Sequence, residues 1–348
     1  MKKIKEFSFC FGCFRKRLPE EKICPDCGYD HTQCHNPKYS LQEGTILNDK
    51  FIVGRFLDQN HYSDSERSYI GMDLLQQKKV LIREFFPSYS VTPEKSQAAI
   101  ELFLQEAKVF SKIKSRSVVS VLDYFYENDT AYIINDFVEH MSSFREVLRQ
   151  KKKIPWRQAV TLMLPVLMEL DKIHKNYQFY PGFEPEIIRI MVDEKTGEEY
   201  AVLEKSVAAR NYLFYNDLEP HIIDEYFECY IDFNIKPSPS SDVYSVCAVM
   251  FETITGRKPP NYYEQSRLLT EKAEPNIISE TLREFDIAYS IKYAITRGLE
   301  LNPNKRFQTI QELCDEFHKG LNHKVSLDIL NSYFDKISRF LKILFQRK

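Results

Sequence analysis

The chain has 348 residues, of which 43% are hydrophobic and 28% charged, and its 48 basic and 50 acidic residues leave a formal net charge of −2. This balance excludes collagen-like, disordered and strongly basic nucleic-acid-coating proteins, and the length suffices for roughly two domains. Only 10 residues are glycine. That is about 3% against the ~7% usual for globular proteins, which argues against machinery built on flexible glycine-rich loops.

Cysteine is concentrated at the start of the chain, where five of the eight cysteines lie in the first 34 residues. Two CxxC units with ten residues between them supply the four thiolates of a tetrahedral zinc site, and this spacing resembles a short zinc ribbon. Such clustering indicates a metal site in a reducing compartment, so we expect a cytoplasmic protein. We predict that a structural zinc ion is held by Cys10, Cys13, Cys24 and Cys27, with Cys34 as a bystander.

The predicted zinc ribbon spans residues 1–36, and Gly12 and Gly28 fall where its knuckles favour positive φ. A closed four-cysteine site leaves no open position for a substrate, so we expect the ribbon to serve in docking. Nucleic-acid binding is the competing use, but the segment from Arg15 to Lys22 mixes both signs of charge, as a solvated loop does. Cysteines buried together by chance, or a redox pair, are the other interpretation.

Neither a signal peptide nor a membrane-spanning segment is expected. The first apolar stretch is followed by three basic residues and by no small-residue cleavage site. The longest apolar run, from Ala159 to Leu170, has about a dozen residues, whereas a spanning helix needs about 20.

The rest of the chain changes from strand-like to helical patterns. After a linker at 37–46, runs rich in β-branched and aromatic residues predict strands at 51–57, 68–75, 78–86, 118–127 and 130–139, with one helix at 100–113. Helices are then predicted at 144–150, 156–176, 242–255, 287–299 and 309–320, with a hairpin that joins 187–192 to 200–203. This order predicts an α+β fold with two lobes, 47–140 and 141–322.

Four strings from this region resemble one known family. VLIREFFP at 80–87 is similar to the third strand, and FLQEAKVFSKI at 103–113 to the C-helix, of the protein kinase fold. PSSDVYSVCAVMFETITGRKPP at 239–260 and LELNPNKRFQTIQEL at 299–313 resemble the long helix of the second lobe and the segment that closes the domain. From Thr45 to Leu321 the chain therefore resembles the bacterial serine/threonine protein kinases, more closely those with an N-terminal zinc ribbon.

The resemblance implies phosphate-binding positions, and this sequence alters them. The family's G-x-G-x-x-G loop corresponds to 58–68, which contains no glycine. Acidic side chains in this loop would repel a triphosphate, and they are Asp58, Asp64 and Glu66. The third-strand lysine is replaced by Arg83, whose wider planar fork fits a nucleotide poorly. Glu106 occupies the position of the C-helix glutamate, so we expect a structural ion pair between Arg83 and Glu106.

The catalytic positions that the resemblance implies are altered as well. The family's H-R-D-x-K-P-x-N loop appears as YPGFEPEI, which places Gly182 at the catalytic aspartate, Glu184 at the lysine and Ile187 at the metal-binding asparagine. The aspartate of D-F-G corresponds to Glu204, or to Lys205 if the alignment shifts by one residue. The sequence thus offers little support for ATP and magnesium binding.

Positions that hold the family's fold together are retained. Asp242 matches the aspartate that anchors the catalytic loop. Arg306 matches the arginine that pairs with the glutamate of the A-P-E motif, which corresponds here to Glu228. A structural role is sufficient to explain a buried pair of this kind, without any catalytic role. His174, near a helix end, is likewise expected to be structural.

The last segment, 323–348, is predicted to be an amphipathic helix. Apolar residues from Leu327 to Leu344 recur at spacings of three and four, and basic residues crowd its end. Three interpretations stay open: packing on the second lobe, pairing with a partner or a second copy, and contact with an anionic membrane surface.

Together these positions favour a pseudokinase, a regulatory or scaffolding protein that keeps the kinase fold, lacks the phosphoryl-transfer residues and acts through protein partners. The alternative is an enzyme that uses the fold for another nucleotide-dependent transfer, with metal ligands at Glu184, Glu186 and Glu204. A nucleic-acid adaptor that acts through the ribbon is a third interpretation, with less support from the sequence.

Overall fold

The computed structural model of the chain describes most residues between Phe9 and Asn322. The ranges are 9–18, 20–57, 66–86, 92–138, 142–217, 237–261, 264–265, 267 and 277–322. The predictions for the loop at 58–65, for Glu228 and for the segment 323–348 lie outside the described residues. The chain divides into two compact units, Met1–Met141 with Val202–Pro220 and Ser142–Ala201 with His221–Lys348.

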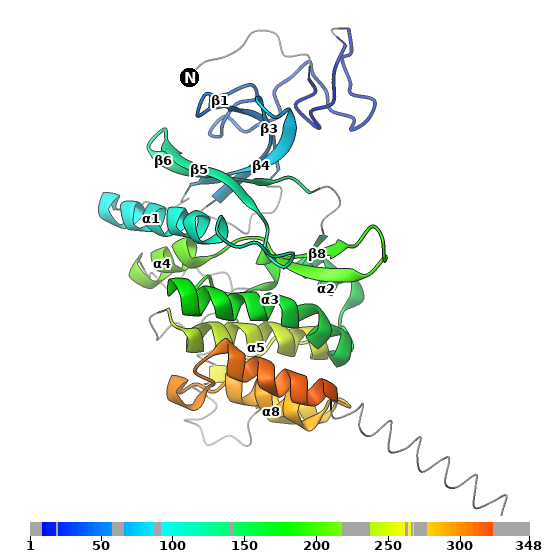
Figure 1. Cartoon of the computed structure of the whole chain (residues 1–348), viewed down its shortest axis with the longest axis vertical. Helices are drawn as coiled ribbons and strands as arrows, with labels where there is room; N and C mark the ends of the chain where they lie inside the picture. The colour runs from blue at the N-terminus through cyan, green and yellow to red at the C-terminus, as the bar shows by residue number, and fades with distance from the viewer. Residues whose placement is uncertain are drawn as a thin grey trace, which may run out of the picture. The chain divides into compact units, whose positions relative to one another are not determined.

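Six antiparallel strands form the main sheet of the first unit (Figure 1). They are β1 (Ile46–Leu47), β2 (Phe51–Phe56), β3 (Glu66–Asp73), β4 (Lys78–Phe85), β5 (Val121–Glu127) and β6 (Thr130–Asp136). Their order is β1-β2-β3-β4-β6-β5. Asn128 and Asp129 join β5 to β6 with φ of 53° and 57°, the left-handed conformation of a two-residue hairpin turn. The longer strands expected from the sequence are present, with ends displaced by up to three residues.

Helix α1 (Pro93–Phe110) begins and ends earlier than the predicted 100–113. Thr92 caps it by accepting a hydrogen bond from the Lys95 amide, and Pro93 suits the first turn, where its missing N–H is not needed. Buried residues begin only at Ala99, so the first turns carry no apolar stripe that periodicity could reveal.

Helix α4 (Ala208–Asp217) is absent from the sequence-based prediction. Ala209 and Leu213 pack against α1, in a buried cluster that includes Phe103 and Ala107. Helix α4 has only 10 residues, too few for a stable isolated helix, so its packing against α1 stabilises the helical conformation.

The predicted linker at 37–46 contributes to the core of the first unit. Leu41 is buried in one cluster with Leu47 and Val53. The Leu41 amide also donates a hydrogen bond to the hydroxyl oxygen of Tyr69 at 3.2 Å. These contacts fix the linker to the sheet.

The second unit is mostly helical. Its described elements are α2 (Phe144–Lys151), α3 (Trp156–Tyr177), α5 (Pro239–Thr255), α7 (Ile277–Arg283), α8 (Tyr289–Gly298), a last helix at 310–322, and the 3-10 turns η1 (Pro185–Ile187) and η3 (Pro303–Lys305). Helix α5 packs between α3 and α8 (Figure 1). A small sheet has the order β7 (Ser142–Ser143), β8 (Ile188–Val192) and β9 (Glu199–Leu203). Within the described ranges, no helix combines the length and apolar character that crossing a membrane requires.

The sequence predicted most of these helices but not α7, and helix α5, predicted at 242–255, begins three residues earlier. Ser238 and Ser241 form a capping box at its start, and Gly256 ends it with φ of 74°. Nearly every residue from Ser240 to Thr255 is buried. Local start and stop signals therefore bound an apolar run that is long enough to be assigned without tertiary information.

Candidate functional site

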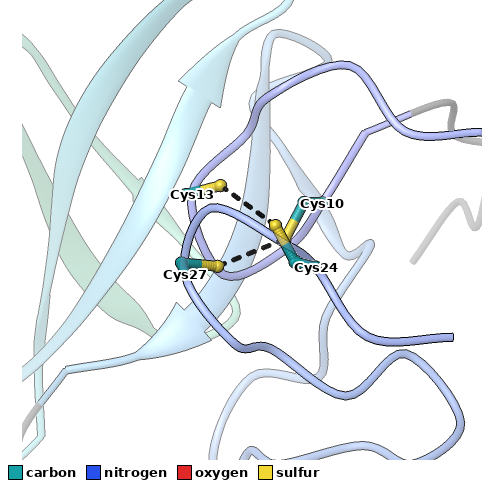
Figure 2. A group of neighbouring side chains, drawn as sticks. All are labelled: Cys10, Cys13, Cys24 and Cys27. Carbon is teal, nitrogen blue, oxygen red and sulfur yellow. Dashed lines mark hydrogen bonds between the residues drawn. The ribbon is translucent and has the colours of Figure 1, made fainter. Parts of the chain in front are cut away.

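Four cysteines from the two predicted knuckles meet in the first unit (Figure 2). The Sγ atoms of Cys10, Cys13, Cys24 and Cys27 all lie within 4.8 Å of one another, and the pairs Cys10–Cys27 and Cys13–Cys24 are 3.7 Å and 3.8 Å apart. Four thiolates bonded to zinc at ~2.3 Å in a tetrahedron are about 3.8 Å apart. The group is therefore compatible with a structural zinc ion. Among the described residues, no other group of three or more His, Cys, Asp or Glu residues could hold a metal ion.

The turns of the two knuckles differ from the prediction at one position. Gly28, which follows the second cysteine of its knuckle, has φ of 70° as expected. In the other knuckle the equivalent residue is Phe14, with φ of 57°. Gly12 does not adopt the left-handed conformation, so that prediction is wrong. A glycine is favoured there by close packing instead, because a Cβ at position 12 would lie 2.6 Å from the Cβ of Tyr29.

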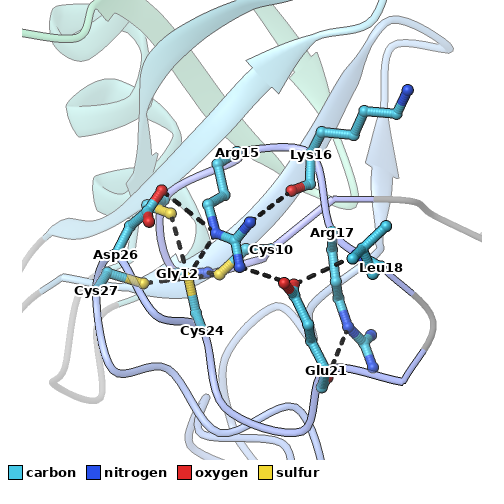
Figure 3. A network of polar contacts seen from close by, with 11 residues as sticks. Cys10, Gly12, Arg15, Lys16, Arg17, Leu18, Glu21, Cys24, Asp26 and Cys27 are labelled. Atoms are coloured by element: carbon cyan, nitrogen blue, oxygen red, sulfur yellow. Dashed lines mark hydrogen bonds and ion pairs between the residues drawn. The ribbon is translucent and has the colours of Figure 1, made fainter.

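Arg15 belongs to the cysteine site (Figure 3). Its Nε lies 3.1 Å from the Sγ of Cys24 and 3.3 Å from a carboxylate oxygen of Asp26, and its Nη2 lies 2.7 Å from Glu21. The predicted solvated loop is therefore wrong at Arg15, whose side chain is 24% exposed. A guanidinium here offsets part of the negative charge that four thiolates bring to a divalent ion.

These contacts act on the thiols themselves. Burial acts to raise the pKa of Cys24, but hydrogen bonds from Arg15 and from backbone amides outweigh it and lower the pKa to about 6. Burial raises the pKa of Cys10. The contact with Arg15 therefore favours the thiolate of Cys24, which is the form that binds a metal ion.

Arg83 on β4 is the centre of a buried charge cluster in the first unit. Its side chain is 1% exposed, and its Nη1 donates a hydrogen bond to Glu106 of α1 at 2.6 Å. Its Nε and Nη2 donate to the carboxylate of Glu66 at 3.1 to 3.2 Å. The Nζ of Lys205 lies 3.1 Å from the same carboxylate. The structure thus contains the expected ion pair between Arg83 and Glu106, and its role stays a prediction.

The four charges of this cluster depend on one another. Burial opposes ionisation of Glu66, but the positive charges of Arg83 and Lys205 outweigh it and lower the pKa of Glu66. At Glu106 burial dominates the attraction of Arg83 and raises the pKa. Since two cations and two carboxyl groups share one buried volume, removal of any one leaves another without compensation.

Glu66 lies in a strand, whereas the sequence predicted that it lies in a loop. The sequence put it in an acidic loop that would face a triphosphate, whereas it is the first residue of β3 and binds Arg83. The register pairs Ser68 with Arg83, so Glu66 lies two residues along the strand on the same face. Strand alternation could have revealed this contact once the start of β3 was known.

The two alternatives for the D-F-G aspartate have different surroundings. Glu204 is buried, with 4% exposed. Lys205 forms the ion pair with Glu66. The hydroxyl of Ser206 then accepts a hydrogen bond from the Ala208 amide at 2.9 Å, at the start of α4. The segment is thereby fixed within the first unit.

In the second unit, His174 and Asp242 form a buried pair. The Nε2 of His174 lies 2.8 Å from a carboxylate oxygen of Asp242, and both side chains are 4% exposed. The ring of Tyr180 packs edge-on against the imidazole, with 5.2 Å between centroids. The pair joins the end of α3 to the first turn of α5. Gly182, at the position of the catalytic aspartate, has φ of 75°.

The other catalytic-loop positions are packed into the second unit. Ile187 is fully buried and Glu184 is 3% exposed. Arg145 of α2 donates hydrogen bonds at 2.7 Å to Glu186 and to Glu252 of α5. Burial raises the pKa of Glu186, and the nearby Glu184 adds to this effect. Glu186 therefore links η1 to two helices through one guanidinium.

Arg306 is fully buried in the second unit and binds backbone carbonyls. Its guanidinium donates to the carbonyl oxygens of Glu300, Leu301 and Ser240 at 2.6, 3.2 and 3.3 Å. It also lies 4.7 Å from the ring centroid of Tyr244. These contacts fasten the segment before η3 to the start of α5, while the expected partner Glu228 lies outside the described residues.

Comparison with known proteins assigns the fold. No family model matches the chain. A probable serine/threonine-protein kinase of Clostridium perfringens is 21% identical over 230 residues, which is 64% of this chain and 32% of that protein. A probable serine/threonine-protein kinase of Clostridium acetobutylicum is 19% identical over 297 residues, which is 82% of this chain and 42% of that protein. The homologues are thus bacterial serine/threonine protein kinases, and the chain spans less than half of their length.

Solved structures agree with this assignment. The structure described as the PpkA-294 apo form superposes with a TM-score of 0.62 and 19% identity, over 80% of this chain and 99% of the other. The PknI kinase domain of Mycobacterium tuberculosis gives a TM-score of 0.58 and 14% identity, over 81% and 100%. The chain therefore has the protein kinase fold, preceded by a cysteine cluster compatible with a zinc ribbon.

Proposed function

We propose that this protein is a pseudokinase, which keeps the protein kinase fold, transfers no phosphoryl group and acts through protein partners in the cytoplasm. The proposal rests on one observation, which is that acidic side chains of the protein already bind the guanidinium of Arg83. In the family this position holds the lysine that grips the nucleotide phosphates. Here the guanidinium is already bound by Glu66 and Glu106, inside the protein.

The electrostatics of the cluster support the same conclusion. Arg83 and Lys205 bring two positive charges, and Glu66 and Glu106 bring two carboxyl groups. The two carboxyl groups thus oppose the positive charges that would otherwise attract a triphosphate. A phosphate that reached Arg83 would have to displace Glu66 and leave its carboxylate buried without compensation, which is costly.

The second unit supports the proposal independently. Gly182 has no side chain that could accept the proton of a substrate hydroxyl, and the side chain of Ile187 has no atom that could ligate magnesium. One carboxyl oxygen of Glu186 accepts a hydrogen bond from Arg145, which gives this side chain a structural contact.

The test is a nucleotide titration of the full chain followed by thermal unfolding, together with transfer of radiolabelled phosphate from ATP. With millimolar ATP and Mg²⁺ or Mn²⁺ we expect no rise in melting temperature and no transfer to the protein itself or to a basic protein substrate. A saturable rise without transfer would overturn the argument from Arg83 and leave the pseudokinase intact. Transfer that is lost in Glu204→Gln would instead establish the nucleotide-dependent transferase.

A further inference from the structure

The first unit holds a close contact between the predicted ribbon and strand β2. At Gly54 in this strand an added Cβ would lie 2.5 Å from the carbonyl oxygen of Phe11 and 2.7 Å from the ring of Phe14. Phe11 lies between the first two cysteines, and Phe14 directly follows the second. One of the few glycines in this chain is therefore required where the cysteine knuckle meets the sheet.

The knuckle and the segment after it also complete the hydrogen bonds of β2. The register of β2 with β3 shifts between Val53 and Phe56, so this part of the strand is irregular. The Arg55 amide donates a hydrogen bond to the carbonyl of Phe11 at 2.8 Å. Asn36 donates to the Gly54 carbonyl at 2.9 Å and accepts from the Phe56 amide at 2.8 Å. Backbone groups that the sheet leaves unpaired are thus satisfied by residues 11 and 36.

Phe14 supplies the apolar part of the contact. Its side chain is 6% exposed and packs in one cluster with Ile52, Ile70 and Met72 of strands β2 and β3. Its φ of 57° is unfavourable for a residue with a side chain, so the neighbouring knuckle must hold it. The turn that places Cys13 at the metal site therefore also aims Phe14 at the sheet.

We infer that metal binding at the four cysteines holds the knuckle on β2, so that the metal-loaded ribbon is a structural part of the kinase-like sheet. A segment this small has too little core to keep the geometry of Phe11 and Phe14 without the metal. Loss of the ion releases the Arg55 amide and uncovers the apolar patch of Ile52, Ile70 and Met72. The four-cysteine site then controls the stability of β2, independently of any nucleotide.

The test uses the full chain, with metal content measured before and after chelation. Removal of zinc should speed hydrogen exchange of the β2 amides by about tenfold or more and increase the binding of an apolar fluorescent dye, while amides of α5 keep their rates. Added Zn²⁺ should reverse both changes. Unchanged β2 exchange after verified metal loss, or the lack of one bound metal per chain, would overturn the inference.

Two variants separate metal binding from docking. Gly54→Ala keeps all four thiols, so it should bind one metal ion, but its β2 exchange should be fast with or without zinc. If this variant fails to fold, Phe14→Ala makes the same test by removing the ring. The control is Cys34→Ser, which removes an exposed thiol outside the cluster and should respond to chelation as the natural chain does. A Gly54→Ala or Phe14→Ala variant whose slow β2 exchange still requires zinc would contradict the inference.

Discussion

Glu66 at the start of β3 accepts hydrogen bonds from the Nε and Nη2 atoms of Arg83 on the neighbouring strand. Both side chains are almost entirely buried, with 7% and 1% exposed. Arg83, which the resemblance places at the position of the kinase lysine, is therefore matched by a carboxylate from the protein itself. The stability of the first unit should therefore depend on the carboxylate of Glu66.

Removal of that carboxylate should destabilise the protein strongly. Glu66→Ala removes the carboxylate that binds both Arg83 and Lys205, and breaking a buried pair costs about 3 to 5 kcal/mol. Denaturant unfolding measures the change. The matched control, Glu101→Ala on the exposed face of α1, should change stability by less than about 1 kcal/mol. Equal effects of the two variants would show that the cluster contributes little.

Restoring the family's residue should not restore nucleotide binding. Arg83→Lys replaces a planar fork that reaches two carboxylates with a single ammonium group, so we expect a lower melting temperature. We also expect that ATP and magnesium do not change the melting temperature, because the carboxylate of Glu66 still pairs with the positive charge at position 83. Arg149→Lys, at an exposed site on α2, is the control for the substitution itself. A melting temperature of Arg83→Lys that rises with ATP would show that the arginine alone prevents binding.

The stability of the first unit should depend on the ionisation of Glu84. Its carboxylate accepts hydrogen bonds from Tyr69 at 2.7 Å and Tyr132 at 3.1 Å, and burial raises its pKa above the ordinary value of 4.5, with Arg67 as the opposing charge. Below the ordinary value the carboxyl is protonated in both states. As pH rises from 4.5 through the folded pKa, Glu84 ionises first in the unfolded chain. The free energy of unfolding therefore decreases over this interval.

Glu84→Gln removes this ionisation while keeping a side-chain oxygen for the tyrosines. The variant should therefore gain stability relative to the natural chain as pH rises from the ordinary value of 4.5 through the raised pKa of folded Glu84. Thermal unfolding of both proteins across this range provides the measurement. A constant difference, or a gain toward acid pH, would show that folding does not raise the pKa of Glu84.

The C-terminal segment should mediate self-association, if its apolar stripe pairs with a second copy. Deletion of residues 325–348 is then expected to leave the melting temperature of the remaining chain unchanged and to reduce the mass measured by light scattering to that of one chain. A matched variant replaces the basic residues Lys336, Arg339 and Lys342 by glutamine and leaves the apolar stripe intact. Its mass by light scattering should equal that of the natural chain. Deletion without a change in mass would refute the pairing.

The sequence by itself determined the features that depend on neighbours along the chain. Two CxxC units define the four-cysteine group because each knuckle needs only a few consecutive residues. Most of helix α5 was recognisable because the run at 242–255 is apolar, and the capping box at Ser238 places its start three residues earlier. The kinase resemblance rested on such strings, and the homologues and the fold confirm it.

Only the tertiary structure decided which distant residues share a charge or a surface. Glu66 looked like a loop acid until the register of β3 placed it beside Arg83, and Arg15 looked solvated until the second knuckle brought Cys24 to it. Gly54 had no evident role before Phe11 was seen against it. Charge pairing and close packing act between atoms that folding brings together, so no local pattern encodes them, whereas caps, turns and metal knuckles are encoded within a few residues.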